Sequence, residues 1–263
     1  MNAGTHRADR LAVAVRLLHY GCPVALGGSI PIVVRRATGR SLYLPGLGFL
    51  LLGIAAAYAL DRLLDTPEAC PGGPIRPLLA ASLALAVAFG AGLALLLPAR
   101  NLALVLLLGA GALSYRRWKR LPFAKALAVP LVWTWAGLVL PFRPESWFGW
   151  RALITPVALP LFLLLTAGCL LCDLKDQEQD RRVGVRSLPV MIGIRRTLIL
   201  AVTLAAGAVL SAGACHRMGL AIGGLVLILL GGFAQLARRG PLGALAVDMA
   251  LTLPGLLIAA HLV

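Results

Sequence analysis

The chain has 263 residues, of which 60% are hydrophobic and only 13% are charged. Soluble domains carry about 25% charged residues, so this composition excludes an ordinary soluble protein and indicates one embedded in lipid. The formal net charge is +15, but the Lys and Arg residues lie between apolar stretches and not along one polar face, so we expect no nucleic-acid partner. The same excess is typical of cytoplasmic loops that contact membrane lipid.

Apolar runs separated by charged or Pro/Gly-rich breaks predict nine membrane-spanning helices. Only helices are expected, because each backbone amide in hydrocarbon needs a partner within its own segment and no alternating barrel pattern is present. The predicted fold is therefore an all-α polytopic bundle forming one domain over residues 1–263. In chain order the predicted spans are Leu17–Val34, Leu44–Leu60, Leu78–Leu97, Leu102–Ser114, Ala126–Leu140, Leu153–Leu171, Thr197–Ala214, Gly219–Ala237 and Leu242–Val263.

The distribution of basic residues predicts which ends of these spans face the cytoplasm. Of the 25 Lys and Arg residues, 18 lie in the amino terminus and in the gaps after the second, fourth, sixth and eighth spans. Cytoplasmic loops are enriched in these residues, so we expect those segments on the cytoplasmic side, in a bacterial cytoplasmic membrane. The exception is a basic segment that this topology places outside, formed by Arg35, Arg36 and Arg40.

The few acidic residues gather in two places. Of ten Asp and Glu residues, seven lie at the ends of the second and sixth spans, which the charge distribution assigns to one side of the membrane. This clustering is the main functional signal in the sequence. The seven are Asp61, Asp65, Glu68, Asp173, Asp176, Glu178 and Asp180.

Spacings of three and four residues put Asp61 with Asp65, and Asp173 with Asp176 and Asp180, on common helical faces. Carboxylates on one face repel one another unless a cation neutralises them. Oxygen-only ligands suit Mg²⁺, which proteins usually hold with one or two carboxylates and substrate phosphates, so the predicted partner is a diphosphate. The alternative is that the acids are solvated loop charges. Their ion-pair partners would then be Arg62, Lys175, Arg181, Arg182 and Arg186.

The gap after the fourth span adds cations on the same predicted side. They could grip phosphate oxygens, or they could simply anchor the helices at the cytoplasmic surface. This gap contains Tyr115, Arg116, Arg117, Lys119, Arg120 and Lys125.

The segment CDLKDQEQDRRVGVRSLPVMIG, Cys172 to Gly193, closely resembles the second aspartate motif of the UbiA-type intramembrane prenyltransferases. Tyr115 and Lys119 match the YxxxK motif of that family, and AAYALDRLLD resembles its first aspartate motif. The sequence departs from that first motif, because Ala57 and Tyr58 stand where the family usually has Asn and Asp. The resemblance covers essentially the whole chain.

The resemblance implies transfer of an isoprenoid group from a prenyl diphosphate to a lipophilic, often aromatic, acceptor. The diphosphate would lie at the cytoplasmic mouth and the isoprenoid tail between the helices, reachable from membrane lipid. Mg²⁺ would be held by Asp61, Asp65, Asp173, Asp176 and Asp180. With these five, Tyr115 and Lys119 form the expected catalytic set, and the expected substrate-binding residues are Tyr58, Arg62, Arg120, Lys125, Lys175 and Arg181.

Two other classes of function stay open. One is a non-catalytic family member that binds prenyl diphosphate or lipid without turnover, and the other is a transporter. Charges near mid-membrane would favour a transporter, but apart from Asp248 the charges lie at helix ends. Cys169 and Cys172 form a CxxC pair without a second ligand pair, so we interpret them as ordinary core residues. Trp133 and Trp135 are either membrane anchors or aromatic faces for a developing cation.

Overall fold

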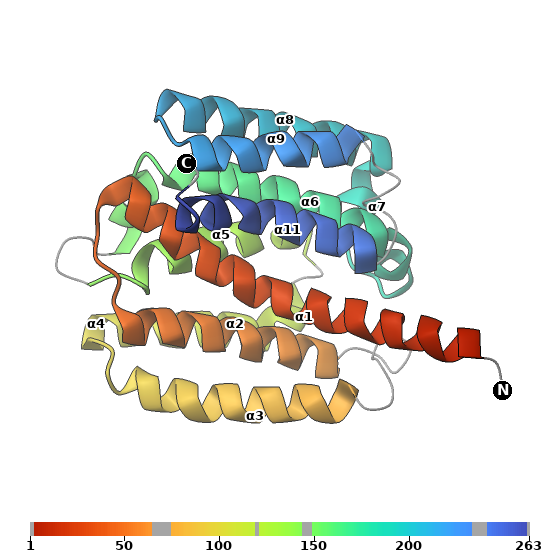
Figure 1. Ribbon diagram of the computed structural model, residues 1–263, viewed down its shortest axis with the longest axis horizontal. Coiled ribbons are helices and arrows are strands. Elements are labelled where there is room, and N and C mark those ends of the chain that lie inside the picture. The colour runs from red at the N-terminus through yellow and green to blue at the C-terminus, as the bar shows by residue number, and fades with distance from the viewer. Residues whose placement is uncertain (1–2, 65–74, 119–120, 144–148, 233–240, 262–263) are drawn as a thin grey trace.

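The structure is a computed structural model that describes residues 3–64, 75–118, 121–143, 149–232 and 241–261, and these form a helical bundle (Figure 1). Within these ranges there is no strand, only an isolated bridge between Leu42 and Phe142. The main helices are α1 (Ala3–Thr38), α2 (Leu44–Leu64), α3 (Ile75–Ala94), α4 (Ala99–Trp118), α5 (Ala124–Val139), α6 (Ala158–Arg182), α8 (Ile194–Ala214), α9 (Met218–Gly232) and α11 (Pro241–Ala259). Two short elements, the 3-10 turn η1 (Gly149–Ile154) and α7 (Leu188–Ile192), flank α6.

Each of the nine predicted spans overlaps one of the nine main helices of the described ranges, so the all-helical prediction is confirmed. The largest difference is α1, which is predicted from Leu17 but begins at Ala3 and extends over 36 residues. At 1.5 Å per residue its length is about 54 Å, well beyond the roughly 30 Å of a hydrocarbon core. A polar sequence can continue a helix past the membrane, and a hydropathy pattern does not detect that extension.

Within the described ranges, four helices are long and apolar enough to cross a membrane, and they cover Leu44–Leu64, Arg76–Ala94, Ala158–Arg182 and Ile194–Ala214. Four further apolar helices in the described chain are shorter, at Asn101–Tyr115, Ala124–Val139, Met218–Gly232 and Leu245–Ala259. The chain is an integral membrane protein by these helices. The count of nine crossings stays a prediction.

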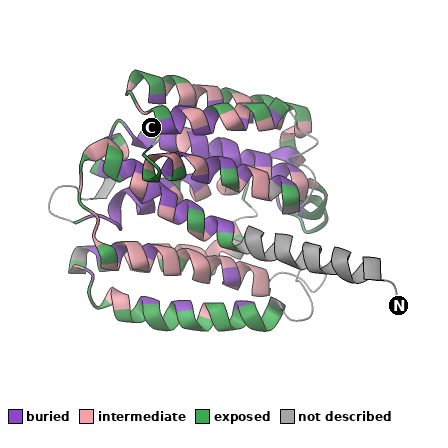
Figure 2. Ribbon diagram, viewed as in Figure 1, coloured by how far each residue is buried: buried purple, intermediate pink, exposed green. Residues whose placement is uncertain are grey.

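Helix α6 lies at the centre of the bundle, and α3 lies at its edge (Figures 1 and 2). In the apolar stretch of α6 that could cross the membrane, 67% of residues are buried, against 17% in the corresponding stretch of α3. Large apolar side chains such as Leu85 and Phe89 of α3 are exposed, as expected for a helix that faces lipid. The central position of α6 matters for function because its last turns carry the second acidic cluster.

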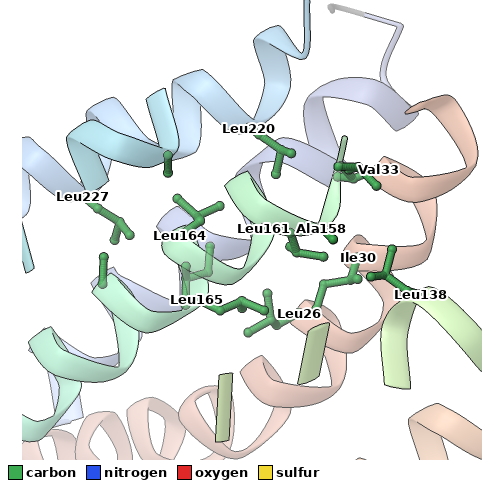
Figure 3. Packing of buried hydrophobic residues seen from close by; sticks show 14 of the residues in the cluster. Leu26, Ile30, Val33, Leu138, Ala158, Leu161, Leu164, Leu165, Leu220 and Leu227 are labelled. Atoms are coloured by element: carbon green, nitrogen blue, oxygen red, sulfur yellow. The ribbon is translucent and has the colours of Figure 1, made fainter. Parts of the chain in front are cut away.

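Leucines of α6 contact α1, α5 and α9 in one continuous core (Figure 3). Leu161, Leu164 and Leu165 are almost fully buried there. On α8, buried alanines recur every three or four residues and let that helix approach its neighbours closely, as small residues do between membrane helices. These alanines are Ala201, Ala205, Ala208 and Ala212.

The loop between α1 and α2 is fastened to the end of α5 through Arg40. Its guanidinium donates hydrogen bonds to the carbonyl oxygens of Leu138, at 3.1 Å, and Arg143, at 3.2 Å. It also lies 4.6 Å from the centroid of the Phe142 ring. Burial lowers the pKa of Arg40, and these contacts offset the cost of desolvating its charge. Arg40 therefore has a structural role. This role explains why a basic residue lies at the end of the bundle that the predicted topology places outside the cytoplasm.

Candidate functional site

The last three turns of α6 place Asp173, Asp176 and Asp180 on one side of the helix, as their spacing predicts. The Asp173 side chain is only 3% exposed, Asp180 is 11% exposed and Asp176 is 31% exposed. An ionised carboxylate at such burial needs a nearby positive charge. The cluster is therefore not a set of solvated loop charges.

The positive charge among these aspartates comes from Lys125, in the first turn of α5. Its Nζ lies 2.7 Å from Asp173 Oδ1, 3.6 Å from Asp180 Oδ2 and 3.9 Å from Asp176 Oδ2. The structure places its ammonium between the three carboxylates, with the side chain 21% exposed. Contact between Lys125 and a diphosphate stays a prediction.

The turn after α6 holds the cluster in position. Gly184 has φ +73°, a left-handed conformation that glycine adopts without strain, and it allows the chain to reverse. The Val185 N–H then donates to the Asp180 carbonyl at 2.8 Å, and the Gln177 amide donates to the Pro189 carbonyl at 2.7 Å. Sequence reasoning missed Gln177, although it lies inside the aspartate motif and its amide could have been assigned to the following turn.

Asp61 of α2 and Tyr115 of α4 belong to the same end of the bundle. The charge of Asp61 acts on the Tyr115 hydroxyl, and so does that of Asp173. Tyr115 packs edge-on against the Trp118 ring with centroids 4.7 Å apart. The two predicted acidic regions thus approach one tyrosine from α2 and α6.

Arg62 links the first acidic region to the second. Its guanidinium donates to the Tyr58 hydroxyl at 3.3 Å and lies 5.2 Å from the centroid of the Tyr58 ring. The charge of Arg62 also acts on Asp176. Tyr58, which replaces the aspartate usual in the family motif, therefore contacts a cation that faces the acidic cluster.

The remaining predicted substrate-binding residues differ in their surroundings. Lys175 Nζ lies 2.8 Å from Asp176 Oδ1, so it belongs to the cluster. Arg181 is 58% exposed and pairs with Glu178 at 3.6 Å, away from the buried aspartates. Asp65, Lys119 and Arg120 lie outside the described residues, as do Glu68 and Cys70.

In the described chain, no three His, Cys, Asp or Glu side chains are arranged to hold a metal ion as they stand. The Lys125 ammonium lies where the carboxylates of α6 would converge on an ion. Two buried oxygens, Asp173 Oδ2 and Asp180 Oδ2, have no hydrogen-bond partner, so Lys125 does not satisfy the cluster fully. Carboxylate oxygens are the donors that Mg²⁺ prefers, so the donor types of this cluster fit a divalent ion.

Among the other intramembrane candidates, Cys169 borders this site, because it lies one helical turn before Asp173 on α6. Cys169 and Cys172 are free thiols inside α6, which agrees with their interpretation as core residues. The charge of Asp248 in α11 acts on Cys172 and Cys22. Trp133 and Trp135 are partly buried and pack against the main core.

The central helix of this membrane bundle ends in buried carboxylates, and a second acidic helix, α2, ends on the same side. These features define an intramembrane helical protein with a charged site at one end of the bundle. The chain belongs to the UbiA prenyltransferase family, whose model matches residues 23–240. Among solved structures it resembles the apo structure of a UbiA homolog from Aeropyrum pernix K1, with a TM-score of 0.64 and 20% sequence identity over 94% of this chain and 98% of that one. No curated protein matches the chain in sequence.

Proposed function

We propose that this protein is a Mg²⁺-dependent intramembrane prenyltransferase, which moves an isoprenoid group from a prenyl diphosphate to a lipophilic, often aromatic, acceptor. Membership of the UbiA prenyltransferase family supports transfer chemistry of this kind. The single observation that carries the proposal is the buried aspartate cluster at the end of α6, which lies at the same end of the bundle as Asp61.

In this proposal Asp173, Asp176 and Asp180, with Asp61 and Asp65, would hold Mg²⁺. The bound ion would supply positive charge to the departing diphosphate. The acceptor forms a bond to the allylic carbon as the carbon–oxygen bond to diphosphate breaks, and the acceptor then loses a proton.

The cationic side chains of the protein would bind and orient the diphosphate. The Arg62 guanidinium contacts Tyr58 and its charge acts on Asp176, and Lys175 is only 13% exposed. Lys119 and Arg120 are proposed to contact the same group. The apolar helices around α6 would exclude water from the allylic carbon, which protects it from hydrolysis.

The test measures Mg²⁺-dependent pyrophosphate release by purified protein, with a panel of prenyl diphosphates and aromatic acceptors. Asp173→Asn and Asp176→Asn should each lower the rate by about 10²-fold or more, the usual scale for removing one group that stabilises developing charge. Glu178→Gln is the matched control, because this carboxylate on the same helix is 69% exposed, and its rate should be unchanged. Undiminished turnover in both aspartate variants would contradict the proposed metal site.

A second candidate is a non-catalytic member that binds prenyl diphosphate without turnover. Two observations favour it: Tyr58 and Ala57 replace the usual polar pair of the first motif, and Lys125 lies among the carboxylates of the second. Such a protein would bind a prenyl diphosphate in an equilibrium assay but release no pyrophosphate with any acceptor. The same purified sample therefore distinguishes the two candidates.

A further inference from the structure

The Lys125 ammonium occupies the centre of the acidic cluster. It lies within 4 Å of an oxygen from each of three aspartates on successive turns of α6, with its shortest contact, 2.7 Å, to Asp173. Lys125 and Asp173 belong to different helices, so packing of α5 against α6 creates this contact. Lys125 therefore supplies positive charge to three neighbouring carboxylates at once, and Lys175 adds a second cation beside Asp176.

An ammonium is an incomplete counter-ion for this cluster. It carries one positive charge, and it leaves Asp173 Oδ2 and Asp180 Oδ2 buried without hydrogen-bond partners. A divalent ion would carry twice the charge and bind carboxylate oxygens at about 2.0–2.1 Å if it is Mg²⁺. The ion and the Lys125 Nζ would need the same oxygens, so both cannot occupy the cluster together.

We propose that Lys125 is a tethered competitor of the divalent ion: its ammonium fills the carboxylate cluster in the metal-free protein, and a metal binds only when Lys125 swings out. The inference rests on the proposed function for the existence of a divalent-ion site. It adds that this chain weakens its own metal affinity through one lysine.

The test compares Mn²⁺ binding to detergent-purified wild-type protein and to Lys125→Gln, by electron paramagnetic resonance of free Mn²⁺. Lys125→Gln should bind Mn²⁺ at least tenfold more tightly, because the competitor is gone and the charge repelling the ion is removed. Lys125→Arg keeps the charge and should bind no more tightly than the wild type. Arg182→Gln is the matched control, because it also removes one positive charge at the end of α6 but from an exposed side chain, and its affinity should change less than threefold.

A second measurement uses wild-type protein and does not depend on a variant folding. Mn²⁺ should increase the acetylation of Lys125 by a lysine-reactive reagent, as quantified by mass spectrometry against a chelator control. Equal or weaker Mn²⁺ binding by Lys125→Gln, or unchanged acetylation of Lys125 at saturating Mn²⁺, would overturn the inference. Failure of the proposed function has a different signature, the absence of Mg²⁺-dependent pyrophosphate release by the wild-type protein.

Discussion

The pair formed by Tyr58 and Arg62 shows how a substituted motif position can still serve a diphosphate site. The family usually has an aspartate at the position of Tyr58. A neutral tyrosine cannot replace that carboxylate as a charged Mg²⁺ ligand. Its ring and hydroxyl instead contact the Arg62 guanidinium one helical turn away. These contacts hold Arg62 where its positive charge acts on Asp176.

We predict that Tyr58→Leu weakens binding of a non-hydrolysable prenyl thiodiphosphate by about fivefold, since a cation–π contact contributes about 1 kcal/mol. The physical reason is that Arg62 loses the ring that orients it. Equilibrium binding of a radiolabelled analogue measures the effect. Tyr58→Phe is the control, because it keeps the ring and loses only the long 3.3 Å hydrogen bond, and it should bind nearly as well as the wild type. A variant Tyr58→Leu with unchanged affinity would exclude this orienting role.

Much of this site could be predicted from local spacing, and its key contact could not. The intervals between Asp173, Asp176 and Asp180 fix a shared helical face before any fold is known. The partner of that face, Lys125, is 48 residues away from Asp173 in the sequence, and only the packing of α5 on α6 brings the two together. Net charge and loop composition place a lysine at the end of the bundle that carries the acidic cluster. They do not distinguish a lysine that contacts phosphate from one that forms an ion pair with the aspartates.

At the scale of the helices, hydropathy predicts the existence of each main helix because lipid exposure demands long apolar surfaces. It does not predict α7, whose five residues follow from local backbone chemistry. Ser187 is extended before Pro189, and Gly193 at φ +81° ends the element, so a turn of helix fits between them. Such short elements depend on individual residues and carry no periodic signal.

The packing of α11 against α1 depends on a glycine. A Cβ added to Gly255 would lie 2.6 Å from Ser29 Cβ and 2.8 Å from the Ser29 carbonyl oxygen, and backbone atoms cannot move aside without shifting a helix. Gly255→Ala should therefore destabilise the protein by about 1–3 kcal/mol, the usual cost of overpacking. Thermal unfolding in detergent checks this.

The control for that substitution is Gly53→Ala on α2, where an added Cβ meets nothing within 4 Å. Alanine favours helix over glycine by up to about 1 kcal/mol, so Gly53→Ala should leave the unfolding midpoint unchanged or raise it. Equal midpoints for the two variants would show that α1 and α11 tolerate separation at this crossing.

At the scale of the whole molecule, the two ends of the bundle differ in chemistry. The carboxyl ends of α2 and α6 share the end with the acidic cluster (Figure 1). The loop between α1 and α2 lies at the other end, where Arg40 donates to the carbonyl of Leu138 in α5 and to that of Arg143 after it. The acidic cluster and a polar structural loop are thus separated by the length of the helices. The distribution of Lys and Arg predicts that the acidic end faces the cytoplasm.

That orientation can be tested with single cysteines in a background where the five native cysteines are replaced. Gln179→Cys on α6 and Ser41→Cys in the loop between α1 and α2 are both exposed and change no charge. A membrane-impermeant maleimide added to intact bacterial cells should modify Ser41→Cys and should modify Gln179→Cys only after the membrane is permeabilised. Reversed labelling would invert the topology and place the acidic cluster outside, where cytoplasmic prenyl diphosphate could not reach it. Labelling of both positions in intact cells would instead contradict their location on opposite sides of the membrane.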